Sequence, residues 1–402
     1  MPPHTLMFGW EYPPVHCGGL GVACQGIVRG LLDHGAHVTL VLPHGDAQEE
    51  NVDVRNSVDG GMRMLKAPTV LQPYAGATVA ESFQLNTGTA MNALYGPDLG
   101  NAVEQFTEQA VALTADCEPD VVHAHDWMTF GAGIRAARHH RRPLVAHVHA
   151  TELDRTDFHP CQWIYDRERH SLLQAECVIA VSQYTRALLV REYGIPESKI
   201  RVVHNALPQN VSPTMQKTTD VHRRHPLVLF LGRLTVQKGA HQFLEAAKLV
   251  ADFRSDVQFV IAGDGDLLPE LMHKMCVLGL QDRVVFAGKV TSPEAMTLYQ
   301  KASCFVMPSV SEPFGLVALE AIANGTPVIL SRQSGAAEVV HNAFVVDYWD
   351  TEKMADCILT IIREEPLRRQ MRAEAPHILS RLTWKNQAAQ ILSVYRSLSE
   401  EC

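Results

Sequence analysis

At 402 residues, the chain is longer than one ordinary hydrophobic core, which predicts two domains. Its net charge of −9, with 20% charged and 46% hydrophobic residues, is typical of a globular protein and argues against nucleic acid or an anionic membrane as the main partner. The nine cysteines form no C-x-x-C pair, and we find neither a signal-peptide pattern nor a bilayer-spanning apolar run, so we expect a cytoplasmic protein.

In the first half of the chain, short apolar runs alternate with helical patterns, as in a parallel sheet covered by helices. Gly18 and Gly19 follow the first expected strand, where glycine either makes a tight turn or lets the backbone approach a ligand. The turn lacks the G-x-G-x-x-G fingerprint of dinucleotide binding. Between residues 47 and 100 we expect an insertion with weak strands. The expected strands are 5–8, 38–42, 62–65, 81–85, 121–125, 144–149, 177–181 and 200–203, and the expected helices are 22–34, 103–116, one ending at 139, 164–175 and one beginning at 182.

Two His-x-His pairs lie in successive expected strands, His123 with His125 and His147 with His149. Alternate residues of a strand share a face, so the members of each pair point the same way. Imidazoles on one face can hold zinc. The chain has twenty histidines, however, and no nearby acidic or cysteine cluster completes a ligand set. We therefore expect no metal site, and a metal hydrolase built on these pairs is the third alternative function.

The second half repeats the alternation of strands and helices after a change in composition. Residues 208–226 are rich in proline, threonine, histidine and arginine without periodicity, which predicts a linker between domains at 1–207 and 227–383. Strands are expected at 227–231, 257–262, 284–287, 304–307, 328–330 and 344–346, and helices up to 252, at 293–302, from 316 and in the tail. Strand–helix units in both halves, without an internal repeat, predict two facing doubly wound α/β domains.

The stretch from Cys304 to Ala323 carries the strongest functional signal, because a buried strand, a turn and an apolar helix follow one another. Glu312 lies in the turn and Glu320 within the helix, where a carboxylate is costly unless an ion pair, a cap or a polar ligand satisfies it. Pro313 prevents the helix from beginning before Glu312, so the first-turn N–H groups lack acceptors. Amides suited to phosphate and carboxylates suited to hydroxyls together predict a sugar nucleotide.

A second loop brings two cations to the same edge of the expected sheet. Arg233 and Lys238 follow the strand 227–231, in the sequence G-R-L-T-V-Q-K-G. A solvated turn is the alternative interpretation. Two cations opposite a helix N-terminus are better suited to a diphosphate.

The motif S-E-P-F-G-x-x-x-x-E-A-x-A-x-G-x-P-V-I, with G-R-x-x-x-x-K-G before it, resembles the signature of retaining glycosyltransferases of family 4 and the related glycogen synthases. The resemblance covers nearly the whole chain and is strongest from Leu227 to Glu338. It implies a GT-B fold, with the tail helix 384–402 crossing back to the first domain. Glycogen synthases carry a lysine just before the glycine pair, where this chain has His16 and Cys17.

The resemblance implies a metal-independent transfer, without a cofactor, from a nucleoside-diphosphate sugar such as UDP- or ADP-glucose to a carbohydrate acceptor. The segments H-A-H-D-W and V-A-H-V-H-A-T-E-L-D-R resemble the acceptor-side and cleft segments of the family. No carboxylate nucleophile is assigned. The implied residues are His149, Arg233, Lys238 and Glu312 for catalysis; Gly18, Gly19, Arg233, Lys238, Gly315, Leu316, Val317 and Glu320 for the donor; and Asp126 and Trp127 on the acceptor side. The alternatives are a sugar-nucleotide 2-epimerase and a non-catalytic nucleotide-sugar-binding protein.

Overall fold

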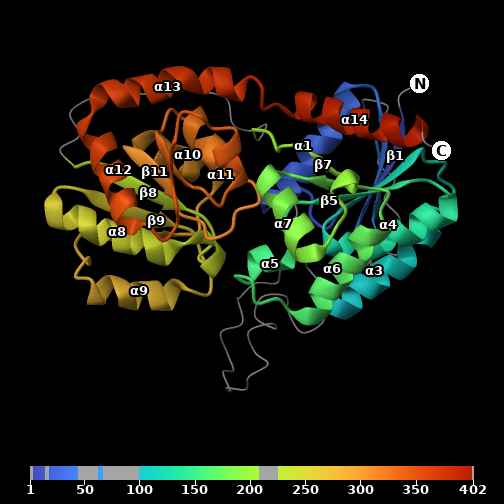
Figure 1. Cartoon of the computed structure of the whole chain (residues 1–402), viewed down its shortest axis with the longest axis horizontal. Coiled ribbons are helices and arrows are strands. Elements are labelled where there is room, and N and C mark those ends of the chain that lie inside the picture. The colour runs from blue at the N-terminus through green and yellow to red at the C-terminus, as the bar shows by residue number, and fades with distance from the viewer. Residues whose placement is uncertain (1–2, 14–17, 44–61, 67–98, 208–224, 401–402) are drawn as a thin grey trace. The chain divides into compact units, whose positions relative to one another are not determined.

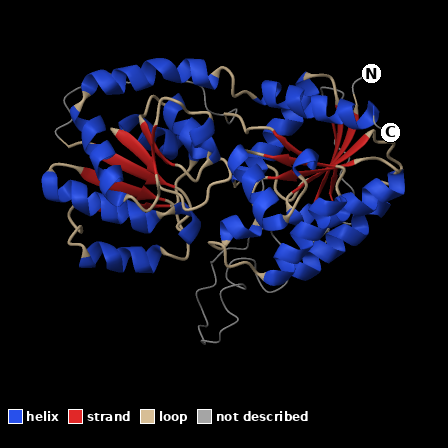
Figure 2. Cartoon of the chain, in the orientation of Figure 1, coloured by secondary structure: helices blue, strands red, loops and turns tan. Residues whose placement is uncertain are grey.

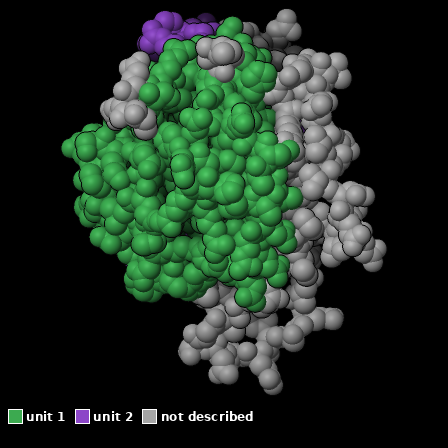
Figure 3. Space-filling view, turned by 90° about the vertical axis from the view of Figure 1, so that its right-hand side faces the viewer, with its two compact units in different colours: residues 1–153, 159–206, 384–402 green, residues 154–158, 207–383 purple. Residues whose placement is uncertain are grey.

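The computed structural model describes residues 3–13, 18–43, 62–66, 99–207 and 225–400. The chain divides into two compact units, which Figure 3 colours separately. Unit 1 contains Met1–Leu153, His159–Ala206 and Trp384–Cys402, and unit 2 contains Asp154–Phe158 and Leu207–Thr383. In each unit a sheet lies between layers of helices, which confirms the predicted doubly wound α/β class (Figure 2). Most of the expected linker, the strand at 81–85, His16 and Cys17 lie outside the described residues.

The sheet of unit 1 has seven parallel strands in the order β3-β2-β1-β4-β5-β6-β7. The chain starts in the middle and builds outward in both directions, so the order reverses between β1 and β4. The strands are β1 His4–Phe8, β2 His37–Leu42, β3 Met62–Lys66, β4 Val121–His125, β5 Leu144–Val148, β6 Cys177–Ala180 and β7 Ile200–Val202. The helices are α1 Gly19–Asp33, α3 Leu99–Leu113, α4 Trp127–His140, α5 Glu152–Arg155, α6 Gln162–Gln174, α7 Gln183–Tyr193 and α14 Trp384–Glu400, with a 3-10 turn at Glu197–Lys199 (Figure 1).

Unit 2 contains six parallel strands in the order β10-β9-β8-β11-β12-β13, so the same reversal falls between β8 and β11. The strands are β8 Leu227–Leu231, β9 Gln258–Ala262, β10 Val284–Gly288, β11 Cys304–Met307, β12 Val328–Ser331 and β13 Phe344–Val346. The helices are α8 Ala240–Phe253, α9 Leu268–Val277, α10 Ser292–Lys301, α11 Leu316–Ala323, α12 Thr351–Arg363 and α13 Glu365–Leu379, with 3-10 turns at Val236–Lys238 and Gly335–Glu338. No described helix is both long and apolar enough to cross a membrane.

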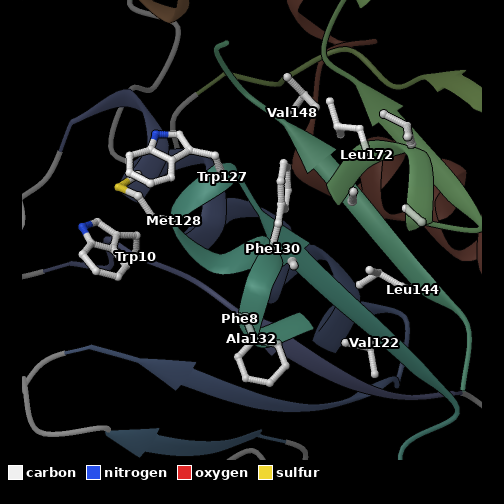
Figure 4. Close-up of a cluster of buried hydrophobic side chains, with 14 of the residues drawn as sticks. Phe8, Trp10, Val122, Trp127, Met128, Phe130, Ala132, Leu144, Val148 and Leu172 are labelled. Carbon is white, nitrogen blue, oxygen red and sulfur yellow. The ribbon is translucent and has the colours of Figure 1, made fainter. Parts of the chain in front are cut away.

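The cores lie between the sheets and their helices. In unit 1, Trp10, Trp127 and Phe130 are buried on one face of the sheet, in the cluster of Figure 4. The other face is covered by α1 and α14, and a third cluster fills unit 2. Strands with both faces covered read as continuous apolar runs, so their positions were predictable from composition. Helix α1 begins at Gly19 instead of the expected residue 22, so Gly18 is its N-cap residue.

Helix α14 packs closely on α1, because α1 presents two glycines to it. A Cβ atom added to Gly26 would lie 2.1 Å from the indole ring of Trp384, and one added to Gly30 would lie 2.4 Å from the Trp384 carbonyl oxygen. Glycine costs a helix interior about 1 kcal/mol relative to alanine. Here the absence of side chains at Gly26 and Gly30 lets helix α14 approach closely and bury Trp384, which is almost wholly inaccessible to solvent.

We expect Gly26→Ala to destabilise the protein by about 2–3 kcal/mol, because the added methyl group overpacks the interface with Trp384. Urea denaturation measures the change. Gly100→Ala is the matched control, because Gly100 also lies in a helix. A Cβ atom added there would have its nearest neighbour 3.9 Å away, so stability should be unchanged or slightly higher. Equal unfolding midpoints for Gly26→Ala and wild type would contradict the tight packing of α14.

Candidate active site

The loops that follow β8 and β11 meet at the carboxyl edge of the sheet in unit 2, where β8 pairs with β11. The Val310 N–H donates a hydrogen bond to the carbonyl oxygen of Gln237 at 2.9 Å. Gly239 adopts a left-handed conformation with φ 72°, and a Cβ atom there would lie only 1.9 Å from the Pro308 carbonyl oxygen. The two loops are therefore fixed against each other at the position where open α/β sheets bind ligands.

Lys238 and Glu312 form an ion pair where these loops meet. Lys238 Nζ lies 2.6 Å from Glu312 Oε2, and the two side chains are 20% and 8% exposed. The Ser309 hydroxyl donates to the same carboxylate oxygen at 3.3 Å. The Glu312 backbone is also held, since its N–H donates to Gln333 at 2.8 Å and its carbonyl oxygen accepts from Gly335 at 3.0 Å. A rigid carboxylate and an ammonium group thus lie side by side at the surface of unit 2.

The N-terminus of α11 provides backbone donors next to this pair. Gly315 is its N-cap residue at φ 101°, a left-handed conformation that favours glycine. Within the described part of the chain, no acceptor faces the N–H groups of Gly315, Leu316 and Val317, and the first amide to bond back is that of Ala318. Such amides carry partial positive charge and suit a phosphate.

Arg233 lies in the same loop system as Lys238 but is exposed. Its guanidinium makes no hydrogen bond or ion pair to any residue that the structure describes. The structure thus brings Lys238 and Glu312 into contact and leaves Arg233 available to a ligand.

Glu320 lies further along α11, partly buried. Its Oε2 accepts a hydrogen bond from the hydroxyl of Tyr299, on α10, at 3.2 Å. Burial raises the pKa of Glu320, and the hydrogen bond from Tyr299 lowers it in part. No cation pairs with this carboxylate among the described residues, so the ion pair that the sequence left open is not present.

We expect Glu320→Gln to stabilise the ligand-free protein at about pH 7 by about 0.5–2 kcal/mol. A carboxyl group with a raised folded-state pKa contributes stability below its unfolded pKa and loses it as pH rises through the folded pKa. The amide removes the cost of the buried charge and keeps an acceptor for Tyr299. The gain should shrink as pH falls and disappear near pH 3, below the unfolded pKa, where the carboxyl is protonated in both states. Urea denaturation at both pH values measures it.

Glu294 on α10 is the matched control, because its carboxylate has the opposite electrostatic setting. It accepts hydrogen bonds from the Thr291 N–H and hydroxyl, and the backbone bond lowers its pKa. Glu294→Gln should therefore lose stability at neutral pH, and the loss should fade as pH falls. If both substitutions destabilise at neutral pH, the carboxylate of Glu320 is not a net cost to the fold.

The carboxyl edge of the sheet in unit 1 carries the other predicted residues. Asp126, at φ 59°, follows β4, and its Oδ1 accepts the N–H of His149 at 2.7 Å. His149 is 9% exposed. Gly18 and Gly19 lie at the exposed N-terminus of α1, where the Gly18 N–H donates to Glu11 at 3.1 Å. Asp126 and His149 are thus brought together.

Trp127 differs from the wall residue that the resemblance implies. It has no exposed surface and belongs to the core of unit 1 (Figure 4). Its ring packs edge-on against that of Trp163, with the ring centroids 5.4 Å apart. Large aromatic side chains bury much apolar surface and so contribute strongly to stability. Trp127, the first residue of α4, therefore anchors the N-terminus of this helix in the core. Its contact with an acceptor stays a prediction.

The four histidines of the His-x-His pairs form one buried cluster. The rings of His123 and His125 stack at 4.4 Å, and those of His147 and His149 stack at 4.3 Å. Burial lowers the pKa of His123 to about 3 and also lowers the pKa values of His125 and His147. These three rings are therefore neutral at pH 7.

The structure adds two residues to this edge that the sequence interpretation did not single out. Cys24 on α1 lies beside the histidine cluster, and Glu11 is a buried carboxylate that faces Gly18. Cys24 lies more than a hundred residues from His125 and His149 in the chain, so no spacing pattern in the sequence connects them. Glu11 lies in the segment after β1 and could have been found only as a polar residue near a glycine turn.

Comparison with known proteins identifies the class to which this fold and site belong. The family described as "Glycosyltransferase Family 4" matches residues 17–209, and "Glycosyl transferases group 1" matches residues 212–377. A glycosyltransferase of Methanocaldococcus jannaschii is 29% identical over 98% of both chains. A glycogen synthase of Mycobacterium tuberculosis is 28% identical over 97% of this chain and 94% of its own.

Solved structures show the same fold. Sucrose-phosphate synthase from Thermosynechococcus elongatus superposes with a TM-score of 0.78 at 20% identity, over 100% of both chains. An Anabaena protein solved with UDP and glucose superposes with a TM-score of 0.70 at 21% identity, over 98% of this chain and 100% of its own. The fold is that of the two-domain GT-B glycosyltransferases. The chain belongs to glycosyltransferase family 4, and it is glycogen-synthase-like, as its motifs predict.

Proposed function

We propose that this glycosyltransferase moves a hexosyl group, with glucose as the first candidate, from a nucleoside-diphosphate sugar to a sugar or glucan acceptor, with retention and without a metal ion. The observation that carries the proposal is the Lys238–Glu312 pair, 2.6 Å apart, beside the N-terminal amides of α11. One group of the pair suits phosphate oxygens and the other suits sugar hydroxyls. The place where they touch is where a sugar–phosphate bond would lie.

The leaving group explains the cations. Breaking the bond between sugar and phosphate leaves negative charge on the nucleoside diphosphate. Lys238, Arg233 and the N–H groups of Gly315 to Val317 stabilise that charge, which is the part that a divalent ion plays elsewhere. Glu312 weakens its ion pair with Lys238 and accepts hydrogen bonds from sugar hydroxyls.

The remaining groups position the substrates. Glu320 offers its carboxylate to the ribose hydroxyls, and His149 orients the sugar towards its acceptor. Gly18 and Gly19 let the backbone approach the donor, and Asp126 keeps His149 in place through its backbone bond. No carboxylate acts as nucleophile in this scheme, so the acceptor attacks from the face that the diphosphate leaves.

Two relatives support the choice of donor. The glycogen synthase of Mycobacterium tuberculosis covers almost the whole chain, and the Anabaena structure contains UDP and glucose. UDP-glucose and ADP-glucose are therefore the donors to test first.

The test is a panel of nucleotide sugars with glucan, maltose, glucose or no acceptor, in buffer with a chelator. Release of nucleoside diphosphate that requires one donor and one acceptor, with an α-linked product from an α-linked donor by NMR, supports the proposal. An inverted product excludes retention. Conversion of the donor to its 2-epimer without an acceptor would assign an epimerase, and calorimetric binding without turnover would assign a binding protein.

A further inference from the structure

We propose that Cys24, His125 and His149 bind a zinc ion, and that occupancy of this site switches the transferase off. The three residues come from α1, β4 and the segment that follows β5, all within unit 1. Their ligand atoms lie within 4.8 Å of one another. The inhibitory part of the proposal rests on the proposed function of His149, whereas the binding part does not.

The donor atoms are of the kind and spacing that zinc requires. Zinc bonds to imidazole nitrogen at about 2.0–2.1 Å and to thiolate sulfur at about 2.3 Å, usually with tetrahedral geometry. Donor atoms around such an ion are then separated by less than the 4.8 Å limit that these three residues meet. His125 Nδ1 and His149 Nε2 are 2.9 Å apart and share a hydrogen bond, which an ion bound by both nitrogens would replace. Small side-chain rotations would let both nitrogens face one ion together with the sulfur of Cys24.

The second observation concerns two unsatisfied polar atoms inside the histidine cluster. Nε2 of His125 and Nε2 of His147 are buried and have no hydrogen-bond partner among the described residues. Buried polar atoms normally find a partner, and each one left without costs about 1–3 kcal/mol. A cation bound at Nε2 of His125 would remove the cost of that atom, whereas one bound at Nδ1 would replace the hydrogen bond to His149. Neutral imidazole is the form that binds metal.

The surrounding charge also favours a cation at Cys24. The carboxylates of Asp126 and Glu11 lie close enough to Cys24 to interact with it electrostatically. Both carboxylates are themselves buried. On binding, the thiol would release its proton to water, and the ion with its thiolate would carry one positive charge beside these two negative groups.

A second set of three, His123, His125 and His147, fits less well. His123 already uses both ring nitrogens, with Tyr395 at 2.5 Å and with His147 at 3.2 Å. This set of three histidines also lacks an anionic ligand, so the charge of a bound ion would stay uncompensated inside the protein. Cys24 therefore decides between the two sets, because thiolate is the ligand that compensates the charge of zinc.

Zinc bound to His149 would occupy the ring that orients the sugar in the proposed transfer. The ion would also add positive charge at the edge of the sheet in unit 1. His149 is the one proposed ligand with some exposed surface, so the ion would reach the site from that side. Occupancy should therefore abolish transfer, and a chelator should restore it.

The binding experiment titrates full-length, chelator-treated protein with Co²⁺, followed by competition with Zn²⁺. We expect one equivalent of tetrahedral cobalt with a thiolate charge-transfer band, which zinc displaces. Cys24→Ser should remove the band and weaken zinc binding by about 100-fold. Loss of a group that only hydrogen-bonds to a metal ligand costs up to about 100-fold in affinity, so loss of a ligand itself should cost at least that much. Cys177→Ser, at another buried thiol of unit 1, and His147→Gln should retain both properties.

A band that persists in Cys24→Ser, or equal zinc affinity in both proteins, would place the metal on other groups, such as the exposed Cys276, and overturn the proposal. Loss of binding in His147→Gln would move the ion to the all-histidine set and also overturn it. If Cys24→Ser fails to fold, X-ray absorption of the wild-type zinc complex decides instead, since one sulfur in the zinc shell is expected and none would exclude Cys24.

The activity experiment separates the two proposals. Zinc should inhibit wild type and leave Cys24→Ser active. Zinc bound through Cys24 without inhibition would overturn the switch and leave the transferase assignment intact. Absence of transfer with every donor would overturn the proposed function, and the cobalt titration would still decide the metal site.

Discussion

Replacing Glu312 with glutamine is expected to lower kcat/KM for glycosyl transfer by about a thousandfold. The amide keeps the size of the side chain but cannot balance the charge of Lys238, 2.6 Å away, and it offers one acceptor oxygen where the carboxylate offers two. The hydrogen bonds that Glu312 accepts from sugar hydroxyls would strengthen as charge develops in the transition state. The loss should therefore fall mainly on kcat, which steady-state rates of nucleoside diphosphate release measure.

The Glu312 result needs a control for folding and one for charge. Removal of one partner from a fully buried ion pair costs about 3–5 kcal/mol, and the partial exposure of Lys238 makes the cost here smaller. Urea denaturation shows whether Glu312→Gln remains folded at the assay temperature. Glu270→Gln removes an exposed carboxylate of unit 2 and should retain full activity. Activity of folded Glu312→Gln within tenfold of wild type would remove Glu312 from the mechanism.

Replacing Lys238 with methionine is expected to lower kcat/KM by about 100- to 1000-fold, through the diphosphate. Methionine matches the length of the lysine side chain but cannot donate to phosphate. Binding of UDP or ADP should weaken strongly, whereas binding of the free nucleoside should change little, because Lys238 lies at the phosphate end of the proposed site. Isothermal calorimetry with both ligands measures that difference.

Lys248→Met is the matched control for Lys238→Met. Lys248 lies on α8 and pairs with Asp252 near the surface, so both nucleotide binding and activity should be retained. The double variant Lys238→Met with Glu312→Gln should lose less than the sum of the two single losses, since the two groups act on the same bond. Equal weakening of nucleoside and diphosphate binding would mean that Lys238 supports the loop and does not contact phosphate.

Local patterns in the sequence were sufficient for the sheets and for part of the site. The strands 121–125, 227–231, 304–307 and 344–346 were predicted at the bounds that the structure shows, because buried parallel strands are continuous apolar runs. Four helices were not predicted: Glu152–Arg155, Leu268–Val277, Thr351–Arg363 and Glu365–Leu379. The first of them is too short to carry a periodicity. The loops after β8 and β11 were found from their turn residues and charges.

The partners of the site residues were beyond the reach of these patterns. The backbone hydrogen bonds that Glu312 donates to Gln333 and accepts from Gly335 join segments that no spacing rule connects. Glu320 was expected to need a partner, but that this partner is the hydroxyl of Tyr299 depends on how α10 packs beside α11. Trp127 was placed on the acceptor side by resemblance, and only the packing of α4 shows it inside the core.

The sequence alone determined the class of fold and the residue types of the loops after β8 and β11, because strand composition, turn residues and the position of Pro313 act over a few neighbouring residues. Tertiary structure alone decided which distant groups share a place: Lys238 with Glu312, α14 with the glycines of α1, and Cys24 with His125 and His149. These contacts join residues tens to hundreds of positions apart. Their geometry follows from the order of strands in each sheet, which local patterns do not encode.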